Sequence, residues 1–133
     1  MTSEQKALYA RAYPNEDPRT SPLVDTQFHA TITMAMCAKA SQGGAPVYAY
    51  VFTKQEGDAG SYHTAEIPYV FSNTAKPSKL ADEMTELWSS FARSGVPSAK
   101  GVPEWRPYTV KGGFTMILDD KSYLSAHHDD KLM

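Results

Sequence analysis

A histidine in a short segment that begins with glycine is the residue of this chain best suited to chemistry. The segment runs from Gly60 to Phe71 and holds His63 and, three residues later, Glu66. An imidazole can take a proton from a hydroxyl nucleophile and return it to a leaving group, provided that a carboxylate orients the ring and N–H groups hold the oxyanion. The chain contains no G-x-S-x-G turn to carry a nucleophilic serine. From the residues alone, His63 is a candidate general base without its nucleophile, or else a structural or solvated histidine.

The other reactive side chains are interpreted as structural. Ser61 lies two residues before His63, but no turn that would present it and no oxyanion donors are indicated, so it is not expected to be a nucleophile. The run His127–Asp130 holds metal-ligand residue types, but adjacent side chains converge poorly on one ion, and neither a metal nor another cofactor is expected. His29 is expected to be a surface or packing residue, and Cys37 a buried small hydrophobic residue.

Length and charge limit the classes of protein to be considered. A chain of 133 residues suits one domain, residues 1–133. A net charge of -2 and scattered basic residues make nucleic acid an unexpected partner. No run is long and apolar enough to span a membrane, and the first residues lack a secretory signal. With one cysteine, the expected location is the cytoplasm, or outside the cell if a larger precursor exists.

The hydrophobic pattern predicts helices that must support the histidine segment. The third of them has the clearest apolar stripe, which is expected to lie in the core and consists of Leu80, Met84, Leu87, Trp88 and Phe91. The second is expected to begin with Asp25 as its N-cap and to end at Gly43-Gly44. The predicted helices cover Ser3–Tyr13, Asp25 to about residue 42, and Ser78–Ser94.

Two strands are predicted, near residues 46–53 and 114–119, and a polar tail is predicted over residues 125–133. The first strand is apolar at nearly every position, which is typical of a strand buried on both faces of a sheet covered by helices. The order helix, helix, strand, loop, helix, strand indicates an α/β fold with too few strands for a complete doubly wound sheet.

The Gly60–Phe71 segment closely resembles the histidine motif of type-B carboxylesterases, the cholinesterase-like branch of the α/β-hydrolases. That motif is similar to G-A-x-H-x-x-E-[IL]-x-[YF]-V-F, and Ser61 stands here in place of its usual alanine. The matching residues are Gly60, His63, Glu66, Ile67, Tyr69, Val70 and Phe71.

Further matches follow in the order that the family shows, from about Tyr13 to Leu124. Trp88–Pro97 resembles W-x-x-F-A-x-x-G-x-P, and Asp25–Phe28 resembles D-x-x-F. Trp105–Tyr108 resembles W-P-x-Y, with Arg106 as an insertion that departs from the pattern.

The resemblance implies a partial α/β-hydrolase fold with His63 as the catalytic histidine. It implies supporting, structural roles for Glu66, Asp25 and Gly60, because the motif glutamate is not the acid of the triad. The oxyanion glycines, the serine and the acid would all precede Met1, and Gly43-Gly44 cannot replace the first of these.

The function implied is that of the histidine-bearing C-terminal part of a carboxylic-ester hydrolase that acts on a small ester. It would be inactive without a serine and an acid supplied by an N-terminal esterase region or partner chain. The alternative is a non-catalytic fragment that forms homo-oligomers or binds another molecule, since a strand apolar on both faces requires neighbours.

Overall fold

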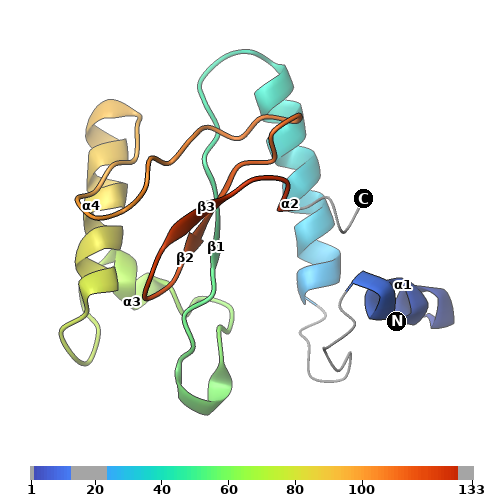
Figure 1. Ribbon diagram of the computed structural model, residues 1–133, viewed down its shortest axis with the longest axis horizontal. Helices are drawn as coiled ribbons and strands as arrows, with labels where there is room; N and C mark the ends of the chain where they lie inside the picture. The colour runs from blue at the N-terminus through green and yellow to red at the C-terminus, as the bar shows by residue number, and fades with distance from the viewer. Residues whose placement is uncertain (1, 13–23, 129–133) are drawn as a thin grey trace.

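The computed structural model describes residues 2–12 and 24–128, and a three-stranded sheet lies at its centre (Figure 1). Strand β1 (Ala49–Phe52) pairs in parallel with β2 (Thr115–Leu118), and β2 pairs antiparallel with β3 (Tyr123–Ser125). The carboxyl ends of β1 and β2 therefore lie at the same edge of the sheet. The two predicted strands are confirmed with shorter bounds, and the α/β class is confirmed.

Helix α4 (Lys79–Ser94) lies on one side of the sheet and has the ends that its sequence predicts (Figure 1). The Ser78 hydroxyl caps it by accepting a hydrogen bond from the N–H of Ala81 at 3.3 Å. Gly95 ends it in the left-handed conformation, with φ 75°, and its N–H donates to the carbonyl of Phe91 at 2.7 Å. This helix lies in the segment that connects the end of β1 to the start of β2.

The core forms between α4 and the sheet, and the segment after α4 closes it. Trp105 is buried, and its indole N–H donates to the carbonyl of Ala49 at 3.1 Å. Tyr108 is buried too, and its N–H donates to the carbonyl of Val47 at 2.7 Å. Arg106, which departs from the W-P-x-Y pattern, is exposed between them and lies 3.9 Å from the centre of the Phe114 ring. The core cluster consists of Tyr69, Leu80, Ala81, Met84, Leu87, Trp105, Met116 and Leu118.

The remaining helices frame the sheet. Figure 1 shows α2 (Val24–Ser41) on the side of the sheet opposite α4, and α1 (Ser3–Ala12) beyond it. Two short helices lie between β1 and α4, the 3-10 helix η1 (Gly57–Ala59) and α3 (Ile67–Val70). Tyr13, the last residue of the first predicted helix, lies outside the described residues.

The predicted burial is wrong at several positions, because it assumed neighbours that the described chain does not supply. Strand β1 is an edge strand here, so Tyr50 keeps 38% of its surface exposed, whereas β2 is buried along its whole length. Phe91 is 47% exposed although it belongs to the α4 stripe, and Cys37 is half-buried rather than buried. The apolar side predicted for α2 is exposed at Ile32 and Ala35.

Strand β3 was not predicted. Its last residue, Ser125, which pairs with Thr115 of β2, is the first residue of the expected polar tail. A run of three residues is too short to show a period, and pairing with β2 rather than a local pattern makes it a strand. Residues 129–133 of that tail lie outside the described part.

None of the described helices is both long enough and apolar enough to cross a membrane.

Because Leu87 is fully buried in the core cluster, we expect Leu87→Ala to lower the free energy of unfolding by about 2–5 kcal/mol. The exposed neighbour Glu86 is the control, and Glu86→Ala should change it by less than about 0.5 kcal/mol. Urea denaturation of both variants measures the difference. Equal effects of the two changes would contradict the assigned core.

Candidate active site around His63

His63 lies in the turn between η1 and α3, beyond the carboxyl end of β1, and is exposed. In open α/β sheets, ligands bind outside the carboxyl ends of the strands, so this is the edge at which a reacting group is expected. Among the described residues, no group forms a hydrogen bond with the imidazole. His63 is thus available to a substrate or to a further polypeptide.

The segment before His63 is closed by its own hydrogen bonds. The N–H of Glu56 donates to the carbonyl of Gly60 at 3.1 Å, and the Ser61 hydroxyl donates to the carbonyl of Lys54 at 2.8 Å. Gly60 has φ 66° and ψ -154°, a conformation that is nearly restricted to glycine. Ser61 therefore closes the loop with its hydroxyl, and Gly60 allows the chain to turn toward His63.

The segment after His63 is fixed to the core through α3. Tyr69 is buried, and its hydroxyl donates a hydrogen bond to the carboxylate of Glu56 in the preceding loop. The Thr85 hydroxyl on α4 donates to the carbonyls of Tyr69 and Val70 at 3.1 and 3.0 Å. His63 therefore lies in a turn that is held on both sides, although its own side chain is in solvent.

Thr64, immediately after His63, has an unusual backbone. Its φ of 74° lies in the left-handed region, which a β-branched residue seldom adopts. Its hydroxyl donates to the carbonyl of His63. Strain of this kind persists only where surrounding contacts impose it, and it is concentrated at functional sites. Thr64 was not among the predicted site residues. The one signal in the sequence is a β-branched residue where a tight turn is expected.

The predicted supporting residues do not meet the imidazole. Glu66 is half-buried at the start of α3, where its carbonyl accepts from the N–H groups of Tyr69 and Val70, and its carboxylate forms no hydrogen bond with His63. Asp25 is the second residue of α2 as observed, rather than the residue before it, and its side chain is outside the described part. Their roles, like that of His63, stay predictions.

Burial, hydrogen bonds and nearby charges raise three pKa values around the loop. Burial, and then the hydrogen bond to Glu56, raise the pKa of Tyr69 to about 12. Burial and the charge of Glu66 raise the pKa of Tyr50. The hydrogen bond to Asp120 raises the pKa of the Lys54 amine. Both tyrosines therefore remain neutral, and Tyr69 remains a hydrogen-bond donor, at physiological pH.

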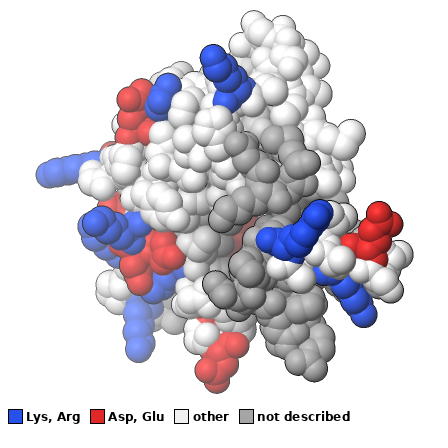
Figure 2. Space-filling model, turned by 45° about the vertical axis from the view of Figure 1, so that its right-hand side comes forward, with Lys and Arg blue, Asp and Glu red and all other residues white. Residues whose placement is uncertain are grey.

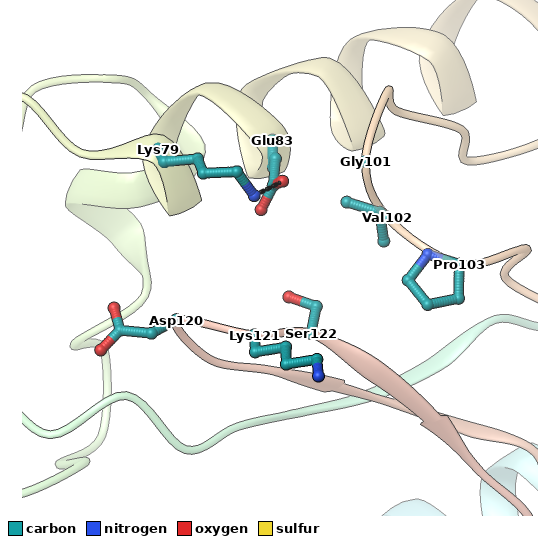
Figure 3. A pocket seen from close by; sticks show the side chains of 8 residues that line it. All are labelled: Lys79, Glu83, Gly101, Val102, Pro103, Asp120, Lys121 and Ser122. Atoms are coloured by element: carbon teal, nitrogen blue, oxygen red, sulfur yellow. Dashed lines mark hydrogen bonds and ion pairs between the residues drawn. The ribbon is translucent and has the colours of Figure 1, made fainter.

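A pocket of about 480 Å³ lies apart from His63, between the start of α4 and the turn that joins β2 to β3 (Figure 3). Its one buried charge is Glu83, which pairs with the amine of Lys79. Asp120, Lys121 and Ser122 line the opposite wall in Figure 3. Its charges balance, so no anion or cation is favoured. Within residues 2–12 and 24–128, no three His, Cys, Asp or Glu side chains gather as a metal site would require, and Asp129 and Asp130 lie outside that part.

Comparison with known proteins gives one family. Residues 7–131 match the Carboxylesterase family. A fumonisin B1 esterase from Sphingopyxis macrogoltabida is 33% identical over 134 residues, an alignment that covers 82% of this chain and 24% of that protein. A human cocaine esterase is 28% identical over an alignment of 114 residues that covers 68% of this chain and 20% of that enzyme. The chain thus spans about a quarter or less of the length of these relatives.

Solved structures show the same fold. An esterase from Clostridium hathewayi, described as hydrolysing aliphatic aromatic polyesters, superposes with a TM-score of 0.74 at 27% identity. That alignment covers 97% of this chain and 28% of the esterase. The small sheet with its helices is therefore a partial α/β-hydrolase fold.

Because φ at Thr64 is positive, we expect Thr64→Gly to raise the free energy of unfolding by about 1 kcal/mol. Thr74 is the matched control, since its hydroxyl also donates to a nearby carbonyl, that of Lys76, but its φ is not positive. Thr74→Gly should lower stability, because glycine gains freedom in the unfolded chain. Urea denaturation gives both values, and a loss of stability in Thr64→Gly would show that the turn is not strained.

Stability should fall as the pH rises from about 10 to about 12, since the pKa of Tyr69 is raised to about 12 in the folded protein from 10.0. Over this range the folded state keeps a proton that the unfolded state has lost, so each increment of pH favours unfolding. Tyr69→Phe should remove this part of the pH dependence, whereas Tyr123→Phe, a change at an exposed tyrosine, should preserve it. Denaturation curves across this pH range compare the three proteins. Parallel pH profiles for wild type and Tyr69→Phe would contradict the assignment.

Proposed function

The chain belongs to the carboxylesterase family, and from this membership we propose that it is the histidine-bearing C-terminal part of a carboxylic-ester hydrolase. The observation that carries the proposal is the position of His63. It lies at the carboxyl edge of the sheet, in a turn that this chain fixes on both sides, and its imidazole faces no partner among the described residues.

In this proposal His63 is the general base and then the general acid of acyl transfer. It removes the proton of a serine hydroxyl as the serine attacks the ester carbonyl, and it returns that proton to the departing alcohol. Water then repeats the sequence on the acyl-enzyme. The proposed substrate class is a carboxylic ester, because the names of the relatives all describe esterases. Those names do not agree on a particular acid or alcohol.

In this proposal the serine comes from another region or another chain, because the sequence holds no G-x-S-x-G, and the acid and the oxyanion donors come with it, because they precede the histidine in the chain order of α/β-hydrolases. Two features support such a complement. Within the described part no strand pairs with the outer edge of β1, and an open edge strand binds further strands readily. On α2, Ile32 and Met34 are exposed, Met34 at 72%. On the face in Figure 2, charges of both signs lie beside one another, so shape and apolar contact rather than a field of one sign would guide docking.

A second function is favoured by the same open edge. Two copies of the chain could pair through β1 and cover their exposed apolar residues without any catalytic role. The two hypotheses differ in whether a nucleophile-bearing partner is needed. Native mass spectrometry of the protein from its own source distinguishes them, because a complex with a larger chain supports the hydrolase and a homo-oligomer alone supports the binding module.

We expect the purified chain to release no stoichiometric burst of p-nitrophenol from p-nitrophenyl butyrate. Mixed with a polypeptide that carries the G-x-S-x-G region, it should hydrolyse the ester, and His63→Ala should reduce kcat by about four orders of magnitude or more. His128→Ala is the control and should retain activity, because His128 lies beyond β3 and outside the Gly60–Phe71 segment. Full activity of His63→Ala in the active mixture would exclude the proposed base.

A further inference from the structure

The carboxyl ends of β1 and β2 are joined by side chains as well as by the sheet. The N–H of Thr53 donates to the carbonyl of Leu118 at 3.0 Å, which extends the ladder by one residue. The Thr53 hydroxyl then donates to Asp119 Oδ2 at 2.7 Å. The other oxygen of Asp119 accepts from the N–H of Asp120 at 2.7 Å. Both carboxylate oxygens are therefore used, one across the strands and one within the turn that follows β2.

A second contact lies beside the first but is weaker. The Lys54 amine pairs with Asp120 Oδ2 at 2.7 Å, and the Asp120 side chain is 74% exposed. Exposed ion pairs are screened by water and salt and contribute little. The Thr53–Asp119 hydrogen bond is half-buried and has a charged acceptor, so it is the stronger of the two.

This junction continues directly into the loop that carries His63. The side-chain amide of Gln55 donates to the carbonyl of Thr53 at 3.1 Å, and the Ser61 hydroxyl donates to the carbonyl of Lys54 at 2.8 Å. Both ends of the loop therefore meet at residues 53 and 54. The turn over His63 follows Ser61 directly, and the N–H of Ala65 donates to the carbonyl of Tyr62 at 3.0 Å within it.

We propose that Thr53 and Asp119 are positioning residues for His63. Their hydrogen bond fixes the base of the loop to the end of β2, and Ser61 passes that constraint to the histidine. A catalytic group has to be held within about 0.5 Å of its productive position, which an exposed side chain on a free loop would not be. The inference rests on the proposed role of His63 as the base.

The loop itself is tested first, by hydrogen exchange in NMR spectra of the full chain. The reporters are the amides of Glu56 and Ala65, whose hydrogen bonds close the loop and the turn. Thr53→Val removes the hydroxyl at nearly constant volume, and Asp119→Ala removes the acceptor. Each change should increase the exchange rate of both amides about tenfold, because the loss of a hydrogen bond to a charged group typically changes the opening equilibrium by that factor. Amides within α4 should keep their exchange rates.

Two controls separate positioning from charge and from general loss of stability. Thr53→Ser keeps the hydroxyl and should restore slow exchange. Asp58→Ala removes an exposed carboxylate from the same loop and should leave both reporters unchanged. Unchanged reporters in Thr53→Val, or faster exchange by the same factor throughout α4, would overturn the proposal.

The catalytic consequence is measured in the mixture with the nucleophile-bearing polypeptide. Thr53→Val should lower kcat about tenfold with KM unchanged, because it displaces the base and touches no substrate, and Thr53→Ser should recover the rate. Unchanged kcat in Thr53→Val would overturn the positioning role and leave the proposed function intact. If no mixture hydrolyses the ester, the proposed function fails, and the exchange rates still decide whether Thr53 and Asp119 hold the loop.

Discussion

The parallel pairing of β1 with β2 is the constraint on which the rest of this structure depends. Register places Ala49 opposite Thr115 and Phe52 opposite Leu118. Two parallel strands cannot be joined by a tight turn, so the chain between them has to cross back over the sheet, and α4 is the helix that does so. The same pairing brings the residues after both strands to one edge, which is why the His63 loop and the Asp119 turn are neighbours although they are far apart in sequence.

The same pairing explains the uneven burial of the sheet. Strand β2 has a neighbour on each side and is buried at all four positions, whereas among the described residues β1 has a neighbour on one side only. An apolar strand at an open edge, and a helix with Met34 exposed on the opposite side of the sheet from α4, form the surface that a complementary part would cover under the proposed function.

Local signals in the sequence predicted the elements whose stability is local. Helix α4 has a serine cap, a glycine stop and a stripe at helical spacing, so its bounds could be predicted closely. The prediction that His63 is a site residue came from the motif, because a single histidine carries no signal that distinguishes a catalytic from a structural role. Burial could not be predicted at Tyr50 or Phe91, because it depends on which strands and helices are present beside them.

The contacts that hold the site could not be predicted from local sequence patterns. Thr53 and Asp119 are 66 residues apart in the sequence. Their hydrogen bond depends on the register of the two strands, which local sequence patterns do not determine. The one available signal was a pair of aspartates directly after a buried strand.

Under the proposed function, the work of a serine hydrolase is divided between this chain and a complementary part. The base needs a fixed direction more than it needs burial, because its reaction is a proton transfer over one hydrogen bond. In this chain, hydrogen bonds of Ser61 and Glu56 close the loop before His63. Thr85 binds the helix after it to α4, and Thr64 between them has an unfavourable φ. All of these contacts come from the chain itself. A complementary part would therefore need to supply a serine, an acid and oxyanion donors to a histidine whose backbone is already placed, and the docking of two preformed surfaces would complete the site.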